Sequence, residues 1–194
     1  PNKARLLLAQ YRDVFSEGYR EAYPPRDAVA DIRIMEQLTP DHPIGVDFYP
    51  IDRDARQCAG LKIWSHRRPI PLSERVPVLE NMGFKVVDER TYHHVSEESA
   101  EPGTWFHDMM LERADGGVVD LGTLKSALES AFVKVMRGGA ESDGYNALVL
   151  TAGLMWRDVA LIRAISRFLK QIRVPCSQDY MWATLRKQSA IAAK

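Results

Sequence analysis

The stretch SHRRPIPLSE, residues 65–74, holds the side chains best suited to bind a ligand. His66, Arg67 and Arg68 lie between a predicted strand and the start of a predicted helix. Guanidinium groups match a carboxylate, and the N–H groups of a helix start favour an anion. These three residues therefore form a predicted effector-binding site for a small carboxylate. The alternative is a solvated basic turn, because charged residues are common at protein surfaces.

Four histidines lie on or beside predicted strands and could ligate a metal. His93 and His94 are neighbours in one strand, so their side chains face opposite ways. His107 lies on the next strand and His66 near the end of an earlier one, so two or three imidazoles could share one face of a sheet. No aspartate or cysteine stands beside them at ligand spacing, which favours half-exposed strand histidines. No metal ligand is therefore predicted.

No residue pattern for catalysis or cofactor binding is found in the chain. The stretch ADGGVVDLG, residues 114–122, lacks the G-x-G-x-x-G order that holds a dinucleotide phosphate, so a flexible turn explains it better. Ser126, Ser130 and Ser166 fall within predicted helices and have no glycine elbow. We therefore assign no catalytic and no cofactor-binding residue, and we expect this chain alone to be inactive.

Basic residues recur at helical spacing near the end of the chain, as Arg163, Arg167 and Lys170. The whole chain has 26 Lys plus Arg and 26 Asp plus Glu, so no global field draws it toward nucleic acid. No aromatic platform is interleaved with the three basic residues. They are therefore predicted to form a solvated stripe, and no nucleic-acid partner is expected.

Length and composition are those of an ordinary globular protein, with 194 residues of which 45% are hydrophobic. No apolar run approaches the ~18 residues of a membrane helix, so no membrane partner is expected. Cys58 and Cys176 form no C-x-x-C pair, which argues against a disulfide framework and fits the cytoplasm. Because the chain begins at Pro1 and its first methionine is Met35, we expect it to be part of a longer protein.

Hydrophobic periodicity divides the chain into helices and strands. Helices are predicted over residues 4–23, 27–38, 72–82, 120–137 and from 142 onward, and strands over 45–50, 60–65, 84–94 and 104–114. The middle reads as a β-α-β-β-α core with an extra leading strand, which predicts an α+β, ferredoxin-like antiparallel sheet with helices on one face. Three parts are expected: helical residues 1–43, an α+β domain over 44–140 and helical residues 141–194.

The core of the middle part is predicted from the apolar faces of its elements. Its expected members are Leu61, Ile63, Leu79, Val86, Val87, Leu124, Leu128 and Phe132. The strand over 104–114 carries apolar residues on both faces, so we expect it to be covered on both sides. Gly83 stands where a left-handed helix C-cap belongs. The polar stretch SEESAEPG, residues 96–103, is expected to be an exposed connection.

The stretch DGYNALVLTAGLMWRDVALIRA, residues 143–164, packs small residues around one Trp-Arg-Asp. A nucleotide-binding loop and a close corner between two helices are the alternatives. Gly153 interrupts a helical pattern, small residues allow two helices to approach closely, and Trp156 can fill the junction. The sequence therefore favours a helical corner.

Four stretches together resemble the large-subunit, NAD-specific bacterial glutamate dehydrogenases. They are YREAYPPRDAVADI, PIPLSERVPVLENMGFKVVDER, ALESAFVKVMRGGAESDGYN and DGYNALVLTAGLMWRDVALIRAISRFLKQI. The resemblance covers most of the chain and follows the family order. It implies a parent enzyme that oxidatively deaminates L-glutamate to 2-oxoglutarate and ammonia. It also implies that this chain is an ACT-like segment with a helical region, ahead of the catalytic domain, and that the catalytic lysines and the NAD-binding fold are expected downstream of Lys194.

The same resemblance implies partners: the rest of the polypeptide, further copies in a homo-oligomer, and an amino-acid effector. The chain departs from a standard ACT module, since the last strand expected after the second helix is missing and the strand over 46–50 is expected to replace it. Two alternatives remain for the function of the chain. One is a free-standing amino-acid-binding ACT-like regulatory module, and the other is an oligomerisation scaffold.

Overall fold

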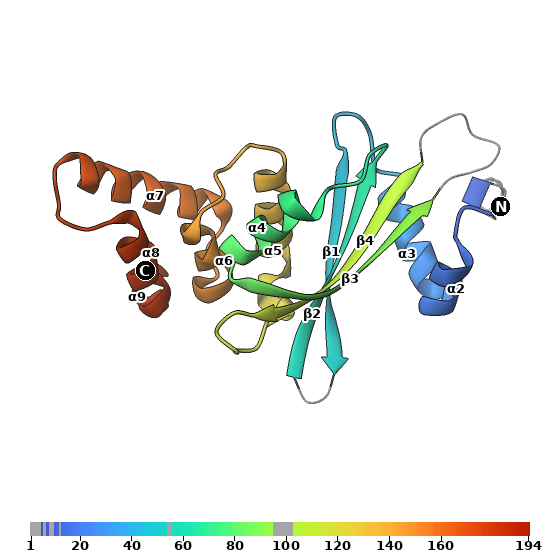
Figure 1. Cartoon of the computed structure of the whole chain (residues 1–194), viewed down its shortest axis with the longest axis horizontal. Helices are drawn as coiled ribbons and strands as arrows, with labels where there is room; N and C mark the ends of the chain where they lie inside the picture. The colour runs from blue at the N-terminus through green and yellow to red at the C-terminus, as the bar shows by residue number, and fades with distance from the viewer. Residues whose placement is uncertain (1–4, 6, 8–9, 12, 54–55, 95–102) are drawn as a thin grey trace. The chain divides into compact units, whose positions relative to one another are not determined.

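The computed structural model in Figure 1 describes residues 5, 7, 10–11, 13–53, 56–94 and 103–194. The chain forms two compact units. Unit 1 comprises Pro1–Asp47, Leu61–Ile70 and Glu89–Met109, and unit 2 comprises Phe48–Gly60, Pro71–Asp88 and Met110–Lys194. Of the helices that the structure describes, none has the length and apolar character needed to span a bilayer.

A four-stranded antiparallel sheet contributes residues to both units. Its strands are β1 (Ile44–Arg53), β2 (Arg56–His66), β3 (Phe84–His94) and β4 (Thr104–Arg113), in the order β1-β2-β4-β3. Strand β4 lies between β2 and β3, which is the split βαβ arrangement. The predicted α+β fold is confirmed. The leading strand β1 pairs with β2 at one edge, so it supplies the fourth strand that no segment after the second core helix provides.

The helices follow the predicted order closely. They are α2 (Glu17–Ala22), α3 (Pro25–Met35), α4 (Leu72–Asn81), α5 (Leu121–Met136), α6 (Ala147–Ala152), α7 (Trp156–Gln171), α8 (Gln178–Lys187) and α9 (Ser189–Ala192), with a short 3₁₀ turn η1 (Gly144–Asn146). The prediction of one helix through residues 4–23 is wrong. A turn at 13–15 interrupts it, and Ser16 caps a new helix by accepting a hydrogen bond from the Tyr19 N–H. Most of the predicted connection over 96–103 lies outside the described residues.

Aromatic side chains form most of the core of unit 1. The rings of Phe15 and Tyr19 stack with their centroids 4.6 Å apart, and those of Trp64 and Phe106 stack at 5.3 Å. Together with Val14 and Met35, these residues are buried in one cluster. The cluster joins the first helical region to β2 and β4.

The ion pair between Asp31 and Lys62 is buried in unit 1. Asp31 of α3 and Lys62 of β2 are 2% and 6% exposed, and the Lys62 Nζ lies 3.1 Å from both carboxylate oxygens. The Tyr19 hydroxyl also donates a hydrogen bond to Asp31 Oδ2, at 2.5 Å. Because the buried carboxylate has both a cation and a hydroxyl donor, its charge is compensated, and the pair fixes α3 against β2.

His94 is expected to make unit 1 sensitive to acid. It is 2% exposed among Phe15, Tyr19 and Phe106, and burial lowers its pKa from 6.5 to about 4. As the pH falls, His94 therefore takes up a proton in the unfolded chain before it does so in the folded protein. The free energy of unfolding that is present above pH 6.5 is lost as the pH falls toward 4. We expect a loss of about 2 kcal/mol at pH 5 relative to neutral pH. Urea denaturation at the two pH values measures it.

A His94→Leu variant is the control for this effect, because leucine keeps an apolar side chain but cannot titrate. The variant should lose the part of the pH dependence that belongs to His94. An identical decline in the variant and the wild type between pH 6.5 and 5 would show that other groups cause the acid sensitivity.

Most of the predicted core residues are buried. Leu61, Ile63, Leu79, Leu128 and Phe132 have no exposed surface, whereas Val86 and Leu124 are half-buried. Val87 is 49% exposed, so its assignment to the core is wrong. It follows Val86 directly on β3, so its side chain faces the opposite side of the strand from those of Phe84 and Val86, and there it stays in solvent.

Two further predictions about local structure are confirmed. On β4, the neighbouring residues Phe106 and His107 are both buried although they face opposite ways, so this central strand is covered on both sides. Gly83 follows α4 with a φ of +92°, the left-handed conformation that glycine adopts most readily.

Candidate functional site

The predicted effector loop joins β2 to α4 in a tightly bonded turn. Arg67 has a φ of +68°, a left-handed conformation that is uncommon for a residue with a side chain. Its N–H donates to the Gly103 carbonyl at 3.2 Å, and the Arg68 N–H donates to the His66 carbonyl at 2.9 Å. The Ser65 hydroxyl donates to the Arg68 carbonyl at 2.7 Å. The loop conformation is therefore held by the protein itself.

His107 anchors the next part of this loop to the sheet. The Ile70 N–H donates to His107 Nε2 at 3.3 Å, so Nε2 must be the unprotonated ring nitrogen. Nδ1 then carries the proton and lies 2.9 Å from the Thr91 hydroxyl, which donates to Glu89 at 2.7 Å. This hydrogen-bond pattern assigns a neutral imidazole that is 1% exposed.

The three predicted site residues lie together, but the loop has fewer hydrogen-bond donors available for a carboxylate than expected. The side chains of Arg67 and Arg68 are exposed, whereas His66 is half-buried. The N–H groups of Arg67, Arg68 and Ile70 donate within the protein, and α4 begins after Pro71, which has no N–H. A carboxylate at this loop would therefore rest on the guanidinium groups, and the site stays a prediction.

The strand histidines are engaged separately. His93 stacks on Trp105 with ring centroids 4.0 Å apart, while His94 lies in the aromatic core and His107 holds the loop. Within the described ranges, no three histidine, cysteine, aspartate or glutamate side chains gather as metal ligands do.

The helical corner predicted over residues 143–164 is confirmed. Helix α6 ends at Gly153, whose φ is +69°, and α7 begins at Trp156. The Trp156 ring is half-buried and has two cations near it, with Lys134 Nζ 4.9 Å and Arg157 Cζ 4.7 Å from its centroid. These distances allow favourable cation–π contacts at the start of α7.

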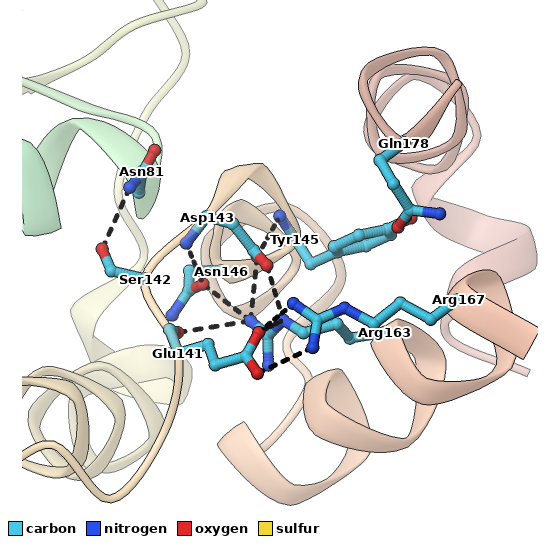
Figure 2. A network of polar contacts seen from close by, with 9 residues as sticks. All are labelled: Asn81, Glu141, Ser142, Asp143, Tyr145, Asn146, Arg163, Arg167 and Gln178. Carbon is cyan, nitrogen blue, oxygen red and sulfur yellow. Dashed lines mark hydrogen bonds and ion pairs between the residues drawn. The ribbon is translucent and has the colours of Figure 1, made fainter. Parts of the chain in front are cut away.

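Figure 2 shows the polar network that holds α7 in unit 2, with Arg163 at its centre. The prediction that Arg163 is solvated is wrong, because this side chain points inward and the residue is 5% exposed. Its Nε and Nη2 lie 2.7 and 2.9 Å from the two carboxylate oxygens of Asp143, and Nη2 donates to Asn146 Oδ1 at 2.9 Å. The planar guanidinium therefore binds one carboxylate at two points and an amide beside it.

The same network continues to the surface and to α8. Arg167, exposed as predicted, forms an ion pair with Glu141 and holds the pKa of that carboxyl below its ordinary value. On the other side, the Tyr145 hydroxyl donates to Gln178 Oε1 at 3.0 Å, and Gln178 Nε2 donates to the Ser166 carbonyl at 3.1 Å. Polar side chains thus connect η1, α7 and α8.

A close contact at Gly144 completes the attachment of α8. The T-shaped pair of Tyr145 and Trp182 has ring centroids 5.5 Å apart. A Cβ on Gly144 would lie 2.6 Å from the indole of Trp182, far below ordinary contact. Glycine at this position therefore makes room for the ring that docks α8. The one sequence signal for the network is the Asp-Gly-Tyr-Asn stretch, in which Asp143 and Asn146 form a capping box.

Known proteins match the chain along nearly its whole length. Three family models match in succession: "Glutamate dehydrogenase, helical motif 2" at residues 1–38, "Glutamate dehydrogenase, ACT3 domain" at 43–124 and "Glutamate dehydrogenase, helical motif 3" at 140–194. The ACT3 match contains all four strands of the sheet, and the helical motif 3 match contains the network around Arg163.

Three curated relatives carry the name NAD-specific glutamate dehydrogenase. The protein of Halomonas elongata is 35% identical over 94% of this chain, that of Pseudomonas aeruginosa 37% over 98%, and that of Mycobacterium tuberculosis 30% over 93%. The matched part is only 11%, 12% and 11% of these relatives, respectively. The chain therefore spans about one eighth or less of their length.

Proposed function

Because the chain belongs to the large NAD-specific glutamate dehydrogenase family, we propose that it is a non-catalytic regulatory or structural part of such an enzyme. The parent protein would oxidatively deaminate L-glutamate to 2-oxoglutarate and ammonia in the cytoplasm, with NAD as the electron acceptor. The observation that carries the proposal is the succession of helical motif 2, ACT3 and helical motif 3 along one chain.

The polar side chains of this chain support a structural part in that enzyme. The Arg163 network joins three helical elements, and the pair of Asp31 and Lys62 joins a helix to the sheet. In both cases the polar side chains bind other parts of the same chain, as expected of residues that hold helices and strands in position. NAD would be held elsewhere in the longer polypeptide, and this chain would act through contacts with that polypeptide or with further copies in an oligomer.

An activity assay tests the proposal. The purified 194-residue chain, given L-glutamate and NAD, should produce no NADH above the rate of a blank. In the same assay, the protein expressed from the full reading frame that contains this segment should produce NADH. Glutamate-dependent NADH formation by the short chain would overturn its non-catalytic assignment, and an inactive full-length protein would overturn the assignment of the parent enzyme.

Regulation by a small carboxylate at His66, Arg67 and Arg68 is the second candidate function, favoured by two adjacent exposed guanidinium groups. A charge-assisted hydrogen bond contributes ~1.5–3 kcal/mol, so an Arg67→Ala, Arg68→Ala double variant should bind a true effector at least about tenfold more weakly. Calorimetric titration of amino acids and dicarboxylates measures this. If both proteins bind equally well, or if the wild type binds nothing at millimolar concentration, the loop is a solvated basic turn and not an effector site.

A further inference from the structure

Helix α7 has its apolar stripe on the outside. The side that faces the rest of unit 2 buries Val159, Arg163 and Ser166. On the opposite side the large apolar residues Leu161, Ile165, Phe168 and Ile172, the last directly after the helix, are 61%, 51%, 57% and 56% exposed. We call these four residues the α7 stripe. A surface helix normally turns such a stripe toward the core.

The helix cannot rotate to bury this stripe without breaking its inner contacts. Arg163 binds Asp143 at two points, and the Ser166 carbonyl accepts a hydrogen bond from Gln178. Both anchors lie on the side of the helix opposite to the stripe. The exposure of the stripe is therefore built into the fold, and contiguous exposed apolar residues of this kind mark an interaction surface.

The spacing within the stripe is that of a helix–helix seam. Its members follow one another at intervals of four, three and four residues, the alternation at which two helices interlock their side chains. The intervals are the same whether the helix is followed from its N-terminal or from its C-terminal end. When two copies of α7 lie antiparallel about the midpoint between Ile165 and Phe168, Leu161 faces Ile172 of the other copy, and Ile165 faces Phe168.

We propose that the α7 stripe is a contact between two copies of this chain, with the two α7 helices antiparallel. The charges at the helix ends favour this direction. Asp158 is exposed in the first turn, whereas Arg173 is exposed just beyond the other end, so antiparallel packing brings the carboxylate of each copy toward Arg173 of its partner. The basic residue of the first turn, Arg157, stacks on Trp156. Antiparallel helix dipoles add to the attraction.

The size of the stripe sets the expected strength of the contact. Four partly exposed side chains present only a few hundred Å², less than the ~800 Å² per partner of a standard stable interface. The dimer should therefore be weak, with a dissociation constant on the order of tens of micromolar. The net charge of zero means that no global repulsion opposes it.

Sedimentation equilibrium of the 194-residue chain, from about 1 µM to about 500 µM, tests the proposal across the range of a weak interface. The wild type should shift from monomer to dimer. Ile165→Asp and Phe168→Asp should each weaken dimerisation at least about tenfold, because each buries an unpaired carboxylate at the seam. Ile191→Asp, at another exposed apolar position in α9, is the matched control and should dimerise like the wild type. Circular dichroism and the denaturation midpoint confirm that each variant is folded.

Cross-linking tests the direction of the helices. In a Cys176→Ser background, a mixture of the Leu161→Cys and Ile172→Cys chains should be joined by a short bismaleimide much faster than either chain alone. Faster linkage of Leu161→Cys to itself would overturn the antiparallel arrangement.

Two outcomes overturn the proposed contact altogether. If the wild type stays monomeric throughout the concentration range, the stripe does not join two copies, and another part of a longer polypeptide becomes the expected partner. A dimer that both aspartate variants retain assigns dimerisation to another surface. The contact does not depend on the proposed enzyme activity, so a failed activity assay leaves it standing.

Discussion

Replacing Phe132 with alanine is expected to lower the free energy of unfolding by about 3–5 kcal/mol. Phe132 lies on the buried side of α5 and has no exposed surface. Truncation removes a large apolar side chain from water-free packing and leaves a cavity that the surrounding helices can fill only in part. Urea denaturation of both proteins at low concentration measures the difference.

Phe168→Ala is the matched control, because it removes the same side chain from a position in α7 that is 57% exposed. Its effect on the unfolding of the monomer should be below about 1 kcal/mol. Comparable losses in the two variants would contradict the assignment of Phe132 to the core of unit 2.

The second large effect is expected at Arg163, whose replacement by alanine should cost about 2–4 kcal/mol. The change leaves the carboxylate of Asp143 without its two-point partner and removes one of the two donors to Asn146 Oδ1, both in a largely buried setting. An uncompensated polar group of this kind is more damaging than the lost bond itself. Thermal and urea denaturation should show the loss.

Arg167→Ala tests whether burial causes that effect. Arg167 belongs to the same helix and also pairs with a carboxylate, but both partners are about half exposed. Exposed ion pairs contribute little to stability, so this variant should unfold close to the wild type. If the Arg167 variant were as unstable as the Arg163 variant, the inner position of Arg163 would not be the cause.

Patterns that depend on near neighbours in the sequence predicted the fold well. The alternation of FKVVDERTYHH gave the bounds of β3, and the apolar spacing over residues 120–137 gave α5 to within a residue at each end. Gly83 and Gly153 ended helices where expected, because a left-handed residue at a helix end is a local requirement. The extra leading strand could be placed only by reasoning about which strand was missing from the sheet.

Features that depend on distant partners were not predicted. Arg163 looked solvated because its spacing with Arg167 and Lys170 resembles a surface stripe, and its partner Asp143 lies on a different element. Periodicity also reveals that α7 has two unlike faces without telling which one is inward. At the effector loop, the sequence placed His66, Arg67 and Arg68 together but could not show that the backbone N–H groups are already bonded within the protein.

The contact between Gly144 and Trp182 has a consequence for how relatives of this chain can vary. Any side chain at position 144 would overlap the indole, so it requires a smaller residue at 182 or a different position for α8. A smaller residue at 182, in turn, removes the reason for glycine at 144. The two positions are therefore expected to change together in evolution, as a covarying pair in which glycine accompanies tryptophan.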